Sequence, residues 1–237
     1  MSYLDWIGAY LAEKRPDVIV NAGDFADIPS LCSYDVGKRQ FEGRRYKNDI
    51  ESVKEGMGRL LGPVRELQER QRRGKEKVYR PRLVMTLGNH EARITKAVDN
   101  DAKLEGIIGL GDLGYEEAGW EVYPFLQVVV VEGIAFSHYF ISGIMGRPVT
   151  SAQQLLNKHH QSAIMGHVQQ RQIAYATRAD GQQMTAIFAG CCAPHEEEYL
   201  GPQGNQFWKG VWMLLDVNDG EFDELPISLK FLKERYG

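Results

Sequence analysis

Residues 17–27 read DVIVNAGDFAD, in which a short apolar run gives way to two carboxylates. The run at 18–20 is β-branched and has no polar alternation, which is typical of a strand buried on both faces. Asp24 and Asp27 follow it at once. The same arrangement returns in residues 82–91, RLVMTLGNHE, where a second apolar run ends at an Asn-His-Glu triplet. Both stretches predict buried strands that carry polar groups at their carboxyl ends.

Two more predicted strands end on a histidine. Residues 134–137 lead into His138, and residues 162–165 lead into Gly166 and His167. Open α/β sheets bind ligands outside the carboxyl ends of their strands, so donors at four strand ends predict one shared site if the sheet brings them together. A mixture of carboxylate, amide and imidazole suits Mn²⁺, Fe²⁺ or Zn²⁺ better than Ca²⁺.

The remaining patterns place helices and hairpins around these strands. Apolar residues at helical spacing predict three helices, and Gly62-Pro63 is expected to kink or divide the second. Turn residues between β-rich runs predict antiparallel pairs. The helices are expected at 3–14, 47–73 and 151–158, and the pairs at 122–131 with 134–137, 172–177 with 184–189, and 211–217 with 221–227. This order predicts an α/β protein, a mixed β-sandwich with helices on its outer faces.

Composition narrows the class of protein. The chain has 237 residues, 43% of them hydrophobic, and a net charge of −4, which argues against a disordered chain and against a globally basic nucleic-acid binder. Cys32, Cys191 and Cys192 cannot form a disulfide framework and indicate a reducing compartment. No apolar run is long enough to cross a membrane, and no signal segment is evident. We expect a soluble, cytoplasmic protein with no membrane partner.

The motifs resemble those of the calcineurin-like metallophosphoesterases. Residues 23–27, GDFAD, are similar to the family's GDxxD motif, and residues 88–91, GNHE, to its GNH[DE] motif. His138 resembles the isolated histidine of the family, and Gly166-His167 the start of its GHxH motif. Each short motif is weak alone, but the four occur in the family's order and each follows a predicted strand.

This resemblance implies one domain over residues 1–237, a four-layer αββα sandwich of mixed sheets with a helical insertion at about 38–80 and a two-metal centre. Asp24 would bridge both ions, and His90, oriented by Asp27, would be the general acid. Hydroxide activated by the metal would attack phosphorus in line. Mn²⁺ is the ion we expect, with Fe²⁺, Zn²⁺ and Mg²⁺ as alternatives. The resemblance gives one ion four ligands: Asp24, Asn89, His138 and His167.

The sequence departs from the family pattern in two places. The family's opening Asp-x-His motif occurs nowhere in the chain, and the strand that carries it is expected to be missing. The second histidine of GHxH is Gln169, which is either a weak ligand or a spectator. A late start of the chain explains the first departure only, whereas decay of one metal site explains both. The sequence therefore allows either one or two bound ions. A second copy of the chain could cover the exposed sheet edge.

Basic residues gather in one tract. Residues 65–82 hold eight basic and three acidic side chains, and those at 38–39 and 44–47 could extend the same surface. Such a tract is either a solvated helix end or a track for the phosphates of DNA or RNA. The candidates for nucleic-acid contact are Arg70, Arg72, Arg73 and Lys75.

The favoured interpretation is a metal-dependent phosphodiesterase or nuclease that acts on a phosphoester substrate. One alternative is a catalytically impaired one-metal relative that serves as a nucleic-acid-binding or scaffolding module. Another is an N-terminally truncated fragment of an active enzyme. His195, in a loop after the cysteine pair, is a further candidate to line the site.

Overall fold

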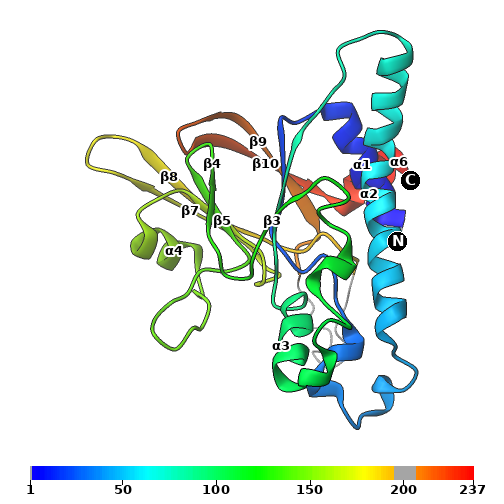
Figure 1. The fold of residues 1–237 in the computed structure, drawn as a ribbon. Coiled ribbons are helices and arrows are strands. Elements are labelled where there is room, and N and C mark those ends of the chain that lie inside the picture. Colours follow the sequence, from blue (N-terminus) through cyan, green and yellow to red (C-terminus); the bar gives the residue numbers. More distant parts are fainter. Residues whose placement is uncertain (1, 195–206) are drawn as a thin grey trace. The chain divides into compact units, whose positions relative to one another are not determined.

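The computed structural model describes residues 2–194 and 207–237, so His195 lies outside the described residues. The chain forms two compact units, residues 1–125 (unit 1) and 126–237 (unit 2). The described residues form three open sheets among helices, with no closed barrel (Figure 1). The predicted α/β class is confirmed, while the αββα layering and the single domain stay predictions. None of the helices within the described ranges is long and apolar enough to span a bilayer.

The sheet of unit 1 consists of three parallel strands. They are β1 (Val18–Asn21), β2 (Arg82–Thr86) and β3 (Glu121–Tyr123), in the order β1-β2-β3. The two strands predicted first are confirmed and pair with each other, but the prediction that residues 18–20 are buried on both faces is wrong, since all four residues of β1 are half-buried. Because β1 and β2 run parallel, the loops that follow them leave from the same edge of the sheet.

The two long helices of unit 1, α1 (Ser2–Lys14) and α2 (Tyr46–Arg73), lie side by side (Figure 1). A Cβ atom at Gly8 would overlap the Leu60 carbonyl and crowd the Pro63 ring, so the glycine permits the close approach. Of the two outcomes predicted for Gly62-Pro63, a kink or a division, the division is wrong, since α2 is continuous across Pro63. Close packing of α1 against this turn of α2 compensates for the hydrogen bond that proline cannot donate.

The remainder of unit 1 is built from short elements. A helix that the sequence patterns did not predict, α3 (Ala92–Asn100), begins just after the GNHE stretch. Five short 3₁₀ turns fill the loops: η1 (Pro29–Leu31), η2 (Ser33–Asp35), η3 (Arg39–Phe41), η4 (Ala102–Leu104) and η5 (Leu110–Leu113).

Unit 2 contains a five-stranded sheet of mixed direction in the order β4-β5-β6-β8-β7. The central strands β5, β6 and β8 are parallel, and the outer pairs are antiparallel. Helix α4 (Ala152–His159), capped by the Ser151 side chain, packs on β7 and β8 and closes an apolar core. The strands are β4 (Val129–Val131), β5 (Ile134–Ser137), β6 (Ala163–Met165), β7 (Arg171–Thr177) and β8 (Gln183–Ala189).

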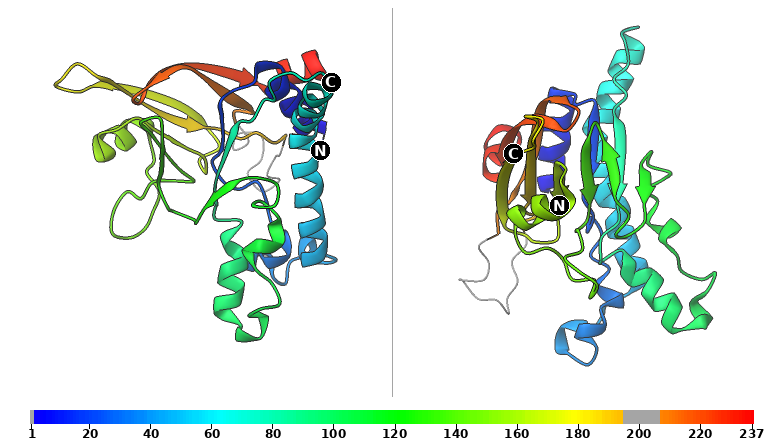
Figure 2. Two further views of the ribbon diagram at one scale, coloured as in Figure 1. Left: turned by 45° about the horizontal axis from the view of Figure 1, so that its top comes forward. Right: turned by 90° about the vertical axis from the view of Figure 1, so that its left-hand side faces the viewer.

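A second hairpin and a short helix complete unit 2. The hairpin consists of β9 (Gly210–Asn218) and β10 (Glu221–Ser228), and α6 (Leu229–Tyr236), which was not predicted, follows it. The hairpin lies beside the β7–β8 hairpin, where Tyr175 and Glu224 are hydrogen-bonded (Figure 2). Both predicted hairpins are confirmed.

One predicted strand proved to be two. Residues 122–131 were expected to pair as a whole with residues 134–137, yet only β4 does so, and β3 pairs with β2 in unit 1. Pro124 has no amide hydrogen for a ladder, and Leu126 takes a positive φ of 68°. Strand β3 therefore ends at Tyr123, just before the end of unit 1 at Phe125.

Candidate functional site

The loop after β1 turns sharply at Gly23 and Asp24. Asn21 Oδ1 accepts a hydrogen bond from Gly23 N at 2.9 Å, and φ is 88° at Gly23 and 56° at Asp24. Aspartate is one of the few side chains that tolerate the left-handed region. The turn directs the Asp24 carboxylate to the loop after β2, where its Oδ1 accepts the amide of His90 at 3.0 Å.

Gly88 makes that approach possible. A Cβ atom at residue 88 would overlap the carboxylate and the amide nitrogen of Asp24. The glycine of GNHE is thus required by the contact between the two loops, because every other residue type would force them apart.

The Glu91 carboxylate accepts hydrogen bonds from both of these loops. Its side chain is fully buried, and Oε2 accepts the amides of Asp24 at 3.0 Å and Gly88 at 2.8 Å. Oε1 accepts the amide of Ala26 at 2.9 Å and the hydroxyl of Tyr115 at 3.2 Å. Burial, followed by the charge of Asp24, raises the pKa of Glu91. One carboxylate therefore holds two loops that lie 67 residues apart in the chain.

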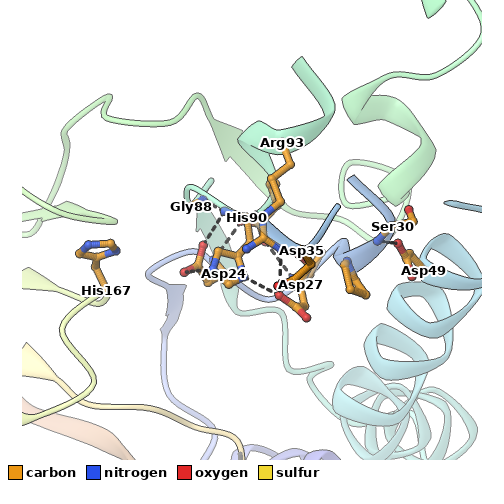
Figure 3. Close-up of polar contacts among 12 residues, drawn as sticks. Asp24, Asp27, Ser30, Asp35, Asp49, Gly88, His90, Arg93 and His167 are labelled. Atoms are coloured by element: carbon orange, nitrogen blue, oxygen red, sulfur yellow. Dashed lines mark hydrogen bonds and ion pairs between the residues drawn. The ribbon is translucent and has the colours of Figure 1, made fainter. Parts of the chain in front are cut away.

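His90 is held by Asp27, as the resemblance implies. Its Nδ1 lies 2.7 Å from Asp27 Oδ1, and its Nε2 lies 3.9 Å from Asp24 Oδ2 (Figure 3). Arg93 Nη1 contacts the same Asp27 oxygen at 3.1 Å. The hydrogen bond from His90 and the charges of His90 and Arg93 lower the pKa of Asp27. An ionised Asp27 places a proton on Nδ1 and leaves Nε2 available for chemistry.

Asn89 stands between Gly88 and His90 in this loop and is partly buried. Unit 1 thus brings together Asp24, Asp27, Asn89 and His90 on the two loops that follow β1 and β2.

In unit 2 the two candidate histidines meet. Strands β5 and β6 are parallel neighbours with Ser137 opposite Met165, so the residues that follow them leave the sheet side by side. Gly166 N donates to the His138 carbonyl at 3.0 Å, and His138 Nε2 lies 3.2 Å from His167 Nδ1. His138 is fully buried, and His167 has a φ of 61°. The prediction that these strand ends converge is confirmed within unit 2.

Aromatic packing fixes the pair. The Tyr139 ring lies 4.8 Å from the His167 ring between centroids, and its hydroxyl donates to the Gly146 carbonyl at 3.4 Å. Ser137 Oγ donates to the Tyr139 carbonyl at 3.0 Å. Tyr139 therefore limits the rotation of His167 from one side.

Gln169 carries an unusual polar atom. Its backbone carbonyl accepts the amide of Trp208 at 3.1 Å, but its side-chain Oε1 is buried and no described residue hydrogen-bonds it. Burial of an unpaired carbonyl oxygen is costly, so such atoms call for a ligand, an ion or water.

The predicted basic tract lies at the end of α2. Arg70, Arg72, Arg73 and Lys75 are all exposed, with Arg72 paired to Glu69 on the same helix. Cations in the last turn also complement the helix dipole.

Comparison of the chain with protein-family models, curated proteins and solved structures found no match. Membership in the calcineurin-like family therefore stays a prediction that rests on the motifs. Asp24, His138 and His167 are candidate metal ligands by their side-chain chemistry.

Three structural contributors were not assigned from the sequence: Glu91, Arg93 and Tyr139. Glu91 lies inside the GNHE stretch, and a carboxylate next to a buried strand was the available signal. Arg93 and Tyr139 carry no local pattern that separates them from ordinary surface or core residues.

Proposed function

We propose that the chain is a metal-dependent phosphoesterase that acts on phosphodiesters. The observation that carries the proposal is the 3.2 Å separation of His138 Nε2 and His167 Nδ1, at the ends of neighbouring parallel strands. Two imidazole nitrogens bound to one tetrahedral ion at about 2.0–2.1 Å lie about 3.3 Å apart. The pair is therefore spaced as two ligands of one ion.

Asp24 and Asn89 of unit 1 are proposed as further metal ligands, and they add the carboxylate and amide donors of a mixed set suited to Mn²⁺. Gln169 is the candidate ligand of a second ion, and its buried, unpaired Oε1 supports that assignment. When bound, a divalent ion lowers the pKa of water and polarises a phosphoryl oxygen.

His90 is proposed to protonate the leaving oxygen. With Nδ1–H donated to Asp27, the proton that can be transferred is the one on Nε2, and the Asp27 carboxylate stabilises the positively charged ring. Arg93 holds Asp27 in place and keeps it ionised. Glu91 fixes the loop that carries His90 without facing the substrate.

A second candidate function is that of a nucleic-acid-binding or scaffolding module that keeps one metal ion and does not hydrolyse its ligand. It is favoured by Gln169, because a neutral amide replaces an imidazole where the resembled motif has its second histidine.

The deciding experiment measures hydrolysis of bis(p-nitrophenyl) phosphate with Mn²⁺ and after EDTA treatment, with Mn²⁺ binding followed by electron paramagnetic resonance. We expect metal-dependent turnover. His90→Asn should reduce turnover by about 10²- to 10⁴-fold and still bind Mn²⁺, whereas His167→Ala should lose both. His159→Asn, an exposed histidine on α4, is the matched control and should lose neither.

Turnover that persists in EDTA, or in His90→Asn at the wild-type rate, would contradict the proposal. Binding of a single ion per chain without turnover would favour the second candidate. Failure of His167→Ala to weaken Mn²⁺ binding would show that the histidine pair is an ordinary N–H···N hydrogen bond.

A further inference from the structure

The segment between Asp27 and α2 follows directly on the residue that contacts His90. Three 3₁₀ turns shape residues 28–45, which we call the 28–45 loop. Ser30 N donates to Asp49 Oδ2 at 3.0 Å, and Arg44 Nη1 donates to the Pro29 carbonyl at 3.1 Å. Both ends of the loop are thereby anchored within a few residues of Asp27.

Asp35 forms ion pairs with two of the cations of this loop, Lys38 and Arg44. Its carboxylate accepts Lys38 Nζ at 3.2 Å, Gln40 Nε2 at 2.7 Å and Arg44 Nη1 at 2.8 Å. The Arg44 guanidinium also lies 5.7 Å from the Phe41 ring centroid. These side chains stabilise the loop and leave its other cations for a partner.

The outer surface of the loop combines an aromatic ring with positive charge. The side chains of Tyr34 and Val36 are large and hydrophobic, yet they are 82% and 66% exposed. Arg39 and Arg45 are exposed and have no carboxylate partner among the described residues. An exposed ring on the same loop as guanidinium groups that pair with no carboxylate suits unstacked bases on a phosphate backbone.

The basic end of α2 is a poorer candidate for that role. Acidic residues lie among its cations, as Asp35 and Glu42 do in the loop, and Arg72 is already paired with Glu69. The nearby Tyr79 is partly buried and donates its hydroxyl to the Pro16 carbonyl at 2.6 Å. It therefore offers no free ring to a base.

We propose that the 28–45 loop binds single-stranded nucleic acid, with Tyr34 stacked on a base and Arg39 and Arg45 against phosphates. The inference deepens the proposed function, since the loop leads directly from Asp27, and it names an unpaired nucleic-acid strand as the substrate class. A duplex fits less well because its bases already stack on one another.

The test measures binding of a fluorescein-labelled oligothymidylate by anisotropy in EDTA, using full-length His90→Asn protein so that no cleavage occurs. Tyr34→Ala should weaken binding by about fivefold or more, and Tyr34→Phe should keep it within about twofold. Arg39→Gln/Arg45→Gln should lower the slope of log Kd against log salt by about 1.4. The matched controls are Phe231→Ala, an exposed ring on α6, and Lys230→Gln/Lys233→Gln, and both should bind as the parent does.

Equal loss in the controls, or unchanged binding in Tyr34→Ala, would overturn the inference. Binding of anionic vesicles in place of the oligonucleotide, lost in the same variants, would also overturn it and identify a membrane surface. Hydrolysis of the small aryl diester is measured separately in the variants with His90 intact. Oligonucleotide binding without that hydrolysis would refute the proposed function, and the 28–45 loop would then be a site that binds single-stranded nucleic acid without cleaving it.

Discussion

In unit 1 the candidate residues stand on two loops that hydrogen bonds to one buried carboxylate hold together, whereas in unit 2 they stand at the ends of two paired strands. The loops of unit 1 depend on a missing side chain at Gly88 and on four donors to Glu91. The histidines of unit 2 depend on strand register and on rings packed over an apolar core.

The two arrangements are sensitive to different substitutions. A hydrogen-bonded clamp fails when one acceptor is lost, because the buried donors that remain are costly. A register-fixed pair tolerates changes in its neighbours, because the backbone ladder keeps both Cα atoms in place.

Gly88→Ala should have the largest effect. The added methyl group must displace Asp24, which we expect to cost about 3 kcal/mol of unfolding free energy and to abolish metal-dependent hydrolysis. Gly58→Ala is the control, since its Cβ would meet no atom within 4 Å on the exposed face of α2. Alanine there should stabilise the protein by about 0.5–1 kcal/mol. Urea unfolding compares the two, and equal behaviour would refute the steric argument.

Glu91→Gln should come next. The amide group would point a donor at amide hydrogens that need an acceptor, at a cost of about 2 kcal/mol. The loss should appear in urea unfolding and as weaker hydrolysis, because the His90 loop is no longer fixed to Asp24. A variant as stable as the wild type would show that the clamp contributes nothing.

Several of the strands and loops compared here were predictable from the sequence, and the features that were not predictable have physical reasons. The apolar runs at 18–20 and 82–87 and the polar residues after them predicted β1, β2 and both loops. The clamp was not predictable, because it joins residues 67 positions apart through side-chain geometry. The division of residues 122–131 between two sheets depends on tertiary pairing, and β-propensity is the same for either partner. Helix α3 has nine residues, so its apolar stripe spans too few turns to be recognised in the sequence.

Asp27→Asn changes the other contact of unit 1, the pair of Asp27 and His90, and we expect a smaller effect on turnover and stability. The amide cannot hold Nδ1–H of His90 with a full charge, so we expect turnover to fall by about tenfold or more while Mn²⁺ binding is kept. Because the pKa of Asp27 is lowered from its ordinary 3.8, its contribution to stability is present above pH 3.8 and is lost as the pH falls through the folded-state value. The difference in Tm between wild type and variant should therefore shrink below pH 4. A difference that is constant with pH would contradict the pairing of Asp27 with His90.

Tyr139→Phe should have the smallest effect, and it tests unit 2. The lost hydroxyl donates a long hydrogen bond, 3.4 Å to the Gly146 carbonyl, so the unfolding free energy should fall by about 0.5 kcal/mol. The ring that packs on His167 remains, and Mn²⁺ affinity should not change. Tyr139→Leu removes the ring as well, and we expect affinity to fall because His167 gains rotational freedom. If the two variants bind Mn²⁺ equally, strand register alone fixes the histidine pair, and the contrast with the clamped loops of unit 1 becomes sharper.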